Sequence, residues 1–133
     1  MKRIFHKDGA PAGNGKCFVF GSNLSGIHGA GAARAARLNY GAEWGAAEGP
    51  TGESYAIPTV RENVAGPLTL DEIRAAVDRF ISYATAHPEL AFFVTRIGCG
   101  LAGHHDQDVA PMFALAPANC SLPDTWAPYL ETA

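Results

Sequence analysis

Three short apolar runs along the chain predict buried β-strands. They cover residues 17–20, 54–57 and 90–95, and Pro58 is expected to stop the second run. The first run, Cys-Phe-Val-Phe, has no polar position on either side, which is typical of a strand covered on both faces in a parallel sheet. We therefore expect a sheet that is enclosed between helices.

Two helices are predicted from the spacing of the remaining apolar residues. The alanine-rich segment that begins at Gly31 has a high helix propensity. Thr69 and Glu72 stand three residues apart before an apolar stripe, which is the spacing of a capping box. This second helix is expected to end at His87-Pro88 and to be about 25 Å long. Its apolar stripe should cover one face of the sheet.

The other segments are expected to be mostly irregular. Residues 6–15 form a lead rich in glycine and proline, residues 41–53 an excursion interrupted by glycines, and residues 118–133 a closing segment. A short helix, capped by Asp106 or Asp108, is expected before the closing segment. Strands that alternate with helices predict an α/β domain with a largely parallel sheet, and the 133 residues suffice for one domain.

Composition and charge exclude several classes of protein. With 47% hydrophobic and 17% charged residues, the chain has the balance of a globular domain. A net charge of −3 argues against extended contact with a nucleic-acid backbone, and no stretch approaches the roughly 18 apolar residues of a membrane span. The three cysteines match no spacing of a metal site or disulfide framework, so we expect reduced thiols in the cytoplasm and no bound metal.

Two glycine-rich turns carry the clearest functional signal. Gly-Ile-His-Gly-Ala-Gly at 26–31 and Gly-Cys-Gly-Leu-Ala-Gly at 98–103 each follow an apolar strand. Glycine lets a ligand approach the main chain closely, so the turns predict a phosphate group held by backbone amides. If the two strands are neighbours, the turns can close on a diphosphate from opposite sides. The amino end of the alanine-rich helix would then face its charge.

Two widespread nucleotide motifs do not explain these turns. The second turn has the spacing of a Rossmann fingerprint, but only 30 residues follow Gly103, too few for the further helix, strand and acidic residue that such a site needs. The first turn has a different spacing. The chain contains no Gly-Lys-Ser or Gly-Lys-Thr, which excludes a P-loop.

The order of the two turns resembles that of macrodomains, which are modules that bind ADP-ribose. Val-Phe-Gly-Ser-Asn followed by Gly-Ile-His-Gly-Ala-Gly is similar to their first phosphate loop and helix. Arg-Ile-Gly-Cys-Gly-Leu-Ala-Gly is similar to the second loop of the branch that removes ADP-ribose from proteins or nucleic acid. The chain as a whole also looks like a small phage and bacterial subgroup of this superfamily, and the resemblance to macrodomains covers about residues 16–115. The resemblance implies a three-layer domain, its mostly parallel or mixed sheet flanked by helices, that binds ADP-ribose or an ADP-ribosylated macromolecule without a cofactor.

The resemblance also implies which residues contact the ligand. Asn23 falls where a macrodomain asparagine approaches the distal ribose, although its amide could instead satisfy the backbone of its own turn. His28 could touch the ligand or face solvent, and Cys99 is expected to fit the loop rather than to act as a nucleophile. The full set is Gly21, Ser22, Asn23, His28, Gly29, Ala30, Gly31, Gly98, Cys99, Gly100, Leu101, Ala102 and Gly103.

The sequence departs from the hydrolytic branch at the positions that would carry catalysis. That branch has a lysine and an aspartate where this chain has Val60 and Ala102, and no lysine follows residue 16. An ADP-ribosyl hydrolase of this sequence would therefore not use a lysine nucleophile.

Two alternatives follow from this departure. In the first, His104, His105 and Asp106 are catalytic, because an imidazole can activate water near neutral pH and a carboxylate can orient it. In the second, the protein is a non-catalytic nucleotide-signal binder or an interaction module, and Asp106 caps a helix while the histidines face solvent. The sequence leaves open both the linkage of the substrate and the oligomeric state.

Overall fold

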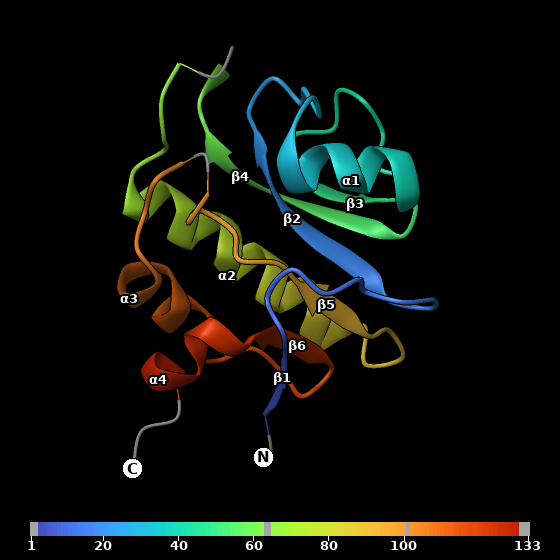
Figure 1. The fold of residues 1–133 in the computed structure, drawn as a ribbon, viewed down its shortest axis with the longest axis vertical. Helices are drawn as coiled ribbons and strands as arrows, with labels where there is room; N and C mark the ends of the chain where they lie inside the picture. Colours follow the sequence, from blue (N-terminus) through green and yellow to red (C-terminus); the bar gives the residue numbers. More distant parts are fainter. Residues whose placement is uncertain (1–2, 63–64, 101, 131–133) are drawn as a thin grey trace.

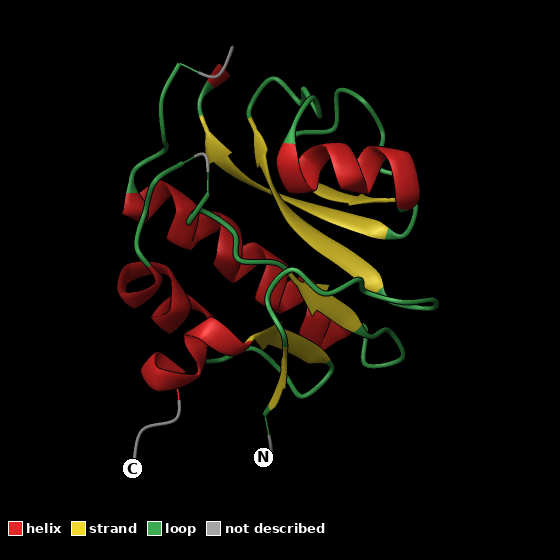
Figure 2. Ribbon diagram, in the orientation of Figure 1, coloured by secondary structure: helices red, strands yellow, loops and turns green. Residues whose placement is uncertain are grey.

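A six-stranded sheet with helices on both faces forms the protein (Figure 1, Figure 2). The computed structural model describes residues 3–62, 65–100 and 102–130. The strands are β1 (Ile4–His6), β2 (Cys17–Asn23), β3 (Gly49–Thr51), β4 (Ser54–Val60), β5 (Phe92–Val94) and β6 (Cys120–Pro123). The helices are α1 (Gly31–Asn39), α2 (Leu70–Ala86), α3 (Asp106–Val109) and α4 (Ala127–Leu130), with short 3-10 helices η2 (Ala110–Phe113) and η3 (Asp124–Trp126). This architecture confirms the predicted three-layer α/β class.

The sheet brings the carboxyl ends of β2 and β5 side by side. Its strand order is β1-β6-β5-β2-β4-β3, and every neighbouring pair is parallel except β3 and β4. After β2 the chain continues toward β4, whereas after β5 it continues toward β6. Such a reversal leaves a crevice beyond the two strands, which is where open α/β sheets bind ligands.

Strand β2 separates two hydrophobic cores. Phe18 and Phe20 pack on the α1 side, together with Ala33 and Ala36 of that helix. Val19 belongs to the larger core on the α2 side. All three strand residues are buried, as the lack of polar positions predicts. The alanines of α1 let this helix lie close to the sheet.

Helix α2 begins with the predicted capping box. Thr69 Oγ1 accepts a hydrogen bond from the amide of Glu72 at 3.2 Å, and Glu72 Oε1 accepts one from the amide of Thr69 at 2.9 Å. The helix has 17 residues, buries its apolar stripe in the larger core and ends before His87. Neither α2 nor any other helix among the described residues is long and apolar enough to span a membrane.

Strand β4 continues to Val60, so the expectation that Pro58 stops it is wrong. Pro58 pairs with Ser22 of β2. On the other side of β4, β3 reaches only as far as Ala56. Pro58 therefore lies where β4 has a partner on one side, an edge-like position that tolerates a proline without an amide hydrogen.

Three strands lie partly or wholly in segments that were predicted to be irregular. β1 ends inside the lead at 6–15, β3 lies in the excursion at 41–53, and β6 lies in the closing segment at 118–133. β6 is inserted between β1 and β5, and all four of its residues are buried. Strands of three or four residues are too short to show a period of two. β1 and β6 are defined by pairing with strands distant in the sequence, and β3 by antiparallel pairing with the adjacent β4.

Helix α3 has no side-chain cap. His105 occupies its N-cap position and makes no capping hydrogen bond through its side chain. The prediction that Asp106 or Asp108 caps this helix is therefore wrong. Asp106 is its first residue, and the carboxylate of Asp106 bonds to Arg96 instead.

Candidate ligand-binding site

A cavity of about 800 Å³ lies at the carboxyl ends of β2, β4 and β5. Both glycine-rich turns, the start of α1 and the segment after β1 contribute to its wall. Nine residues of the predicted ligand-contacting set line it: Gly21, Ser22, Asn23, Gly29, Ala30, Gly31, Gly98, Gly100 and Ala102. His28, Cys99 and Gly103 do not line it, and Leu101 lies outside the described residues. The two turns, distant in sequence, therefore face one space.

The side chain of Asn23 closes the first turn. Its Oδ1 accepts a hydrogen bond from the Ile27 amide at 3.0 Å, and its Nδ2 donates to the Ile27 carbonyl at 2.8 Å. The Gly26 amide donates to the Asn23 carbonyl at 2.9 Å. Asn23 thus satisfies the backbone of its own turn, one of the two roles that its sequence position allows. Because it also lines the cavity, the ribose contact stays a prediction.

Helix α1 begins with its amino end at the cavity. Ala30 occupies the N-cap position and has no side-chain acceptor for the first amides. Ala30, Gly31 and Ala32 all line the cavity. The first amides of a helix lack intrahelical acceptors and carry partial positive charge, so this end favours an anion by up to about 2 kcal/mol when partly buried.

Residues 41–48 hold the first turn and the end of β2 in place through hydrogen bonds. The Gly45 amide donates to the Gly26 carbonyl at 2.8 Å. The Ser22 hydroxyl, at the end of β2, donates to the Ala47 carbonyl. No sequence pattern predicts this support, because the glycines of the excursion indicate only that regular structure is interrupted.

His28 lies in this supporting region rather than at the cavity. Its ring is fully buried, and its Nε2 is 3.1 Å from the carbonyl oxygen of Ala46. It contacts the rings of Phe20 and Trp44 at an angle, with centroids 5.3 and 6.3 Å away. Its Nδ1 has no hydrogen-bond partner among the described residues. Of the two alternatives for His28, exposure to solvent is wrong, because the ring is buried and joins the turn to the excursion; contact with the ligand stays a prediction.

An ion pair closes the second turn across its base. Nε and Nη2 of Arg96 each donate to the Asp106 carboxylate at 2.7 Å. Inside the turn, the His104 amide donates to the Gly98 carbonyl at 2.8 Å. Hydrogen bonds from Arg96 hold the pKa of Asp106 below its ordinary value, so this carboxyl group is ionised at neutral pH. The main chain of the turn is therefore fixed at both ends.

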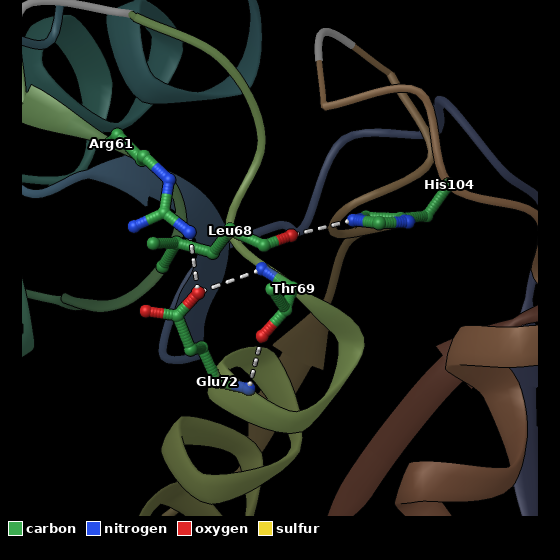
Figure 3. Close-up of polar contacts among 5 residues, drawn as sticks. All are labelled: Arg61, Leu68, Thr69, Glu72 and His104. Carbon is green, nitrogen blue, oxygen red and sulfur yellow. Dashed lines mark hydrogen bonds and ion pairs between the residues drawn. The ribbon is translucent and has the colours of Figure 1, made fainter.

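The structure does not bring the side chains of the three candidate catalytic residues together at the cavity. Nε2 of His104 is 2.9 Å from the carbonyl oxygen of Leu68, next to the capping box of α2 (Figure 3). His105 is exposed. Asp106, besides its ion pair, accepts a hydrogen bond from Nε1 of Trp126 at 2.9 Å. None of the three lines the cavity, so their catalytic role stays a prediction that this geometry does not favour.

Cys99, in the second turn, is a half-buried free thiol. Burial first, and a hydrogen bond to Asp106 second, raise the pKa of Cys99 to about 12. Burial also raises the pKa values of Cys17 and Cys120 to about 12. A thiol that remains protonated at neutral pH is a poor nucleophile, which agrees with a role of Cys99 in the fit of the loop.

We expect these three free thiols to react slowly with Ellman's reagent in the folded protein. The thiolate is the reactive form, and a raised pKa leaves little of it at neutral pH. Native modification should be roughly a hundredfold or more slower than modification in urea. Mass spectrometry would locate the modified residue. Rapid native labelling of Cys99 would contradict the assignment.

Part of the cavity wall is aromatic. The rings of Phe18 and Tyr40 stack with centroids 4.3 Å apart, and those of His6 and Phe93 with centroids 3.7 Å apart. All four residues line the cavity. Burial lowers the pKa of His6, so its ring is mostly neutral near pH 7. Such a surface suits a planar base, and no local signal in the sequence joins these four residues.

Few charged side chains line the cavity. Among the described residues of its wall, the ionisable side chains are those of His6, Asp8, Tyr40 and Arg96. Main-chain amides are thus the most numerous groups that could hold an anion. In the described part of the chain, no group of three or more His, Cys, Asp or Glu side chains could hold a metal ion.

Comparisons with known proteins find similar folds but indicate no function. No family model and no curated protein matches the chain. A solved structure of a protein of unknown function from Bacteroides thetaiotaomicron is similar, with a TM-score of 0.61 and 18% identity over 92% of this chain and 98% of that chain. A crystal structure of a protein from Bacteroides thetaiotaomicron gives a TM-score of 0.57 and 17% identity, over 91% of this chain and 99% of that chain. The fold and the cavity thus define a three-layer α/β protein with a crevice at the carboxyl edge of its sheet.

Proposed function

We propose that this protein is a macrodomain-like module that binds ADP-ribose or a related ADP-ribosyl ligand. The observation that carries the proposal is that both glycine-rich turns and the amino end of α1 line one cavity. Three sources of main-chain amides then converge on the space where a diphosphate would lie. The aromatic part of the same wall accommodates the base.

The size and charge of the cavity fit such a ligand. Pockets of about 300–1,000 Å³ hold small molecules, and this one has about 800 Å³. Backbone amides stabilise a diphosphate without the lysine that a P-loop supplies. The chain carries a net charge of −3, which favours a small nucleotide ligand over an extended nucleic acid.

We expect ADP-ribose to bind the protein with a dissociation constant well below about 1 mM, the affinity that corresponds to about −4 kcal/mol. Isothermal titration calorimetry measures this directly, and ribose 5-phosphate serves as a control that lacks the base and the second phosphate. Absence of heat at millimolar ADP-ribose, together with an unchanged melting temperature, would contradict the proposal.

The proposal is for binding first and hydrolysis second. His104 and Asp106 have structural partners outside the cavity wall, which favours a binder over a hydrolase. If the protein does release ADP-ribose from a modified protein or oligonucleotide, a variant with His105→Ala and Asp106→Ala should lose turnover. Unchanged turnover in that variant would exclude the assignment of these residues to catalysis.

The three free thiols suit a reducing cytoplasm, which we propose as the compartment.

A further inference from the structure

One cationic side chain stands at the wall of the cavity. Arg96 follows β5 by two residues and precedes the second glycine-rich turn by two. Among the described residues that line the cavity, no other lysine or arginine occurs. The remaining fixed charge on that wall is the carboxylate of Asp8. Among the described residues of the wall, Arg96 is therefore the one permanent positive side-chain charge available to a ligand.

The guanidinium of Arg96 is held in a defined orientation. Its Nε and Nη2 form a fork with the two carboxylate oxygens of Asp106, both at 2.7 Å. Nε1 of Trp126 donates to the same carboxylate at 2.9 Å, and the Trp126 ring is fully buried. The carboxylate is therefore fixed by the core, and it fixes one edge of the guanidinium.

The other edge of the guanidinium is available. No described residue accepts a hydrogen bond from Nη1 of Arg96, and 40% of the Arg96 side chain is exposed. A guanidinium has five N–H donors, and its planar geometry matches phosphate oxygens. An ion pair that leaves one donor edge free can thus present that edge to an anionic ligand at the cavity.

From this geometry we infer that Arg96 contacts the anionic group of the bound ligand, and that Asp106 and Trp126 are positioning residues that hold its guanidinium at the cavity. The inference rests on the proposed function, because it assigns a side chain to the diphosphate of that ligand. It also gives Asp106 a role that differs from general acid or base catalysis.

The test compares the affinity of four proteins for ADP-ribose by calorimetry at two ionic strengths. They are the wild type, Arg96→Gln, Asp106→Asn and the control Arg61→Gln. Arg61 is a matched control because its exposed guanidinium also pairs with a carboxylate, that of Glu72 at 2.8 Å, yet it does not line the cavity. Circular dichroism establishes that each variant is folded.

We expect Arg96→Gln to weaken ADP-ribose binding by about tenfold or more at low salt, as for the loss of a hydrogen bond to a charged group. The difference from the wild type should shrink near 1 M salt, where the Debye length falls to about 3 Å. Asp106→Asn should weaken binding less, and Arg61→Gln should bind as the wild type does.

The outcomes separate this inference from the proposed function. If the wild type does not bind ADP-ribose, the proposed function is wrong and the inference is wrong with it. If the wild type binds and a folded Arg96→Gln binds equally well, only the inference is overturned. If Arg96→Gln weakens ADP-ribose binding equally at low and high salt, the inference is overturned too. Salt screens a contact between charges, whereas it does not screen a change in the shape of the turn.

Discussion

Replacing Gly26 by alanine is expected to destabilise the protein by about 2 kcal/mol or more and to weaken ADP-ribose binding. Gly26 has a φ of +69°, a conformation that side chains rarely adopt. A Cβ atom there would lie 2.3 Å from the carbonyl carbon of Gly45. Because this close contact is with the backbone of Gly45, the clash can be removed only if the first turn and the excursion move apart. Urea unfolding measures the loss of stability.

Gly29→Ala is the matched control for this change, since it adds the same methyl group to the same turn. No positive φ restricts Gly29, and its Cβ would meet only the side chain of Ile27, at an ordinary distance of 3.8 Å. Its effect on the free energy of unfolding should stay within about 0.5 kcal/mol. Equal stability of the Gly26→Ala variant and the wild type would show that the turn is not held against the excursion.

Truncating Trp126 to alanine is expected to cost about 3–5 kcal/mol of stability. The Trp126 side chain is fully buried and packs on Phe113, with ring centroids 4.9 Å apart. Its Nε1 also donates to the Asp106 carboxylate at 2.9 Å, so the truncation leaves both a cavity and a lost hydrogen bond. Thermal and urea unfolding report the change.

Two further variants help to interpret the stability loss of Trp126→Ala: a partial truncation and a control at an exposed tryptophan. Trp126→Phe keeps most of the ring contact and removes the donor to Asp106, so its loss should be intermediate. Trp44→Ala removes a tryptophan whose side chain is 57% exposed, and it should cost less than about 1 kcal/mol. If Trp44→Ala were as destabilising as Trp126→Ala, the assignment of Trp126 to the core and of Trp44 to the surface would be wrong.

The parts of the fold that the sequence predicts well are those with local signals. The capping box of Thr69 and Glu72 depends on residues three positions apart, and the helix begins where that spacing indicates. Strand β2 has no polar position and is buried on both faces. The two glycine-rich turns follow neighbouring parallel strands, which is the condition under which the sequence predicts that they face one space.

The parts that the sequence misses depend on distant partners. Strand β6 has four residues and is defined by pairing with β1 and β5. Arg96 and Asp106 are ten residues apart, and their ion pair gives no periodic pattern. The capping role predicted for Asp106 is wrong because a cationic partner offers its carboxylate a stronger, charge-assisted bond.

The support of the first turn is a further example of this limit. Residues 41–48 carry no motif, yet the hydrogen bond between Gly45 and Gly26 holds the turn in place. The aromatic wall likewise combines His6, Phe18 and Phe93 from three strands of the sheet. Only the folded chain brings these side chains together.

The most direct test of the central claim is a crystal structure of the protein soaked with ADP-ribose at a saturating concentration. The claim is that the two glycine-rich turns and the start of α1 form one diphosphate site. We predict that the diphosphate lies between the amides of residues 29–31 and those of Gly98, Gly100 and Ala102, with its base at the rings of Phe18 and Phe93. An ADP-ribose molecule bound elsewhere, or a cavity without ligand at that concentration, would contradict the claim.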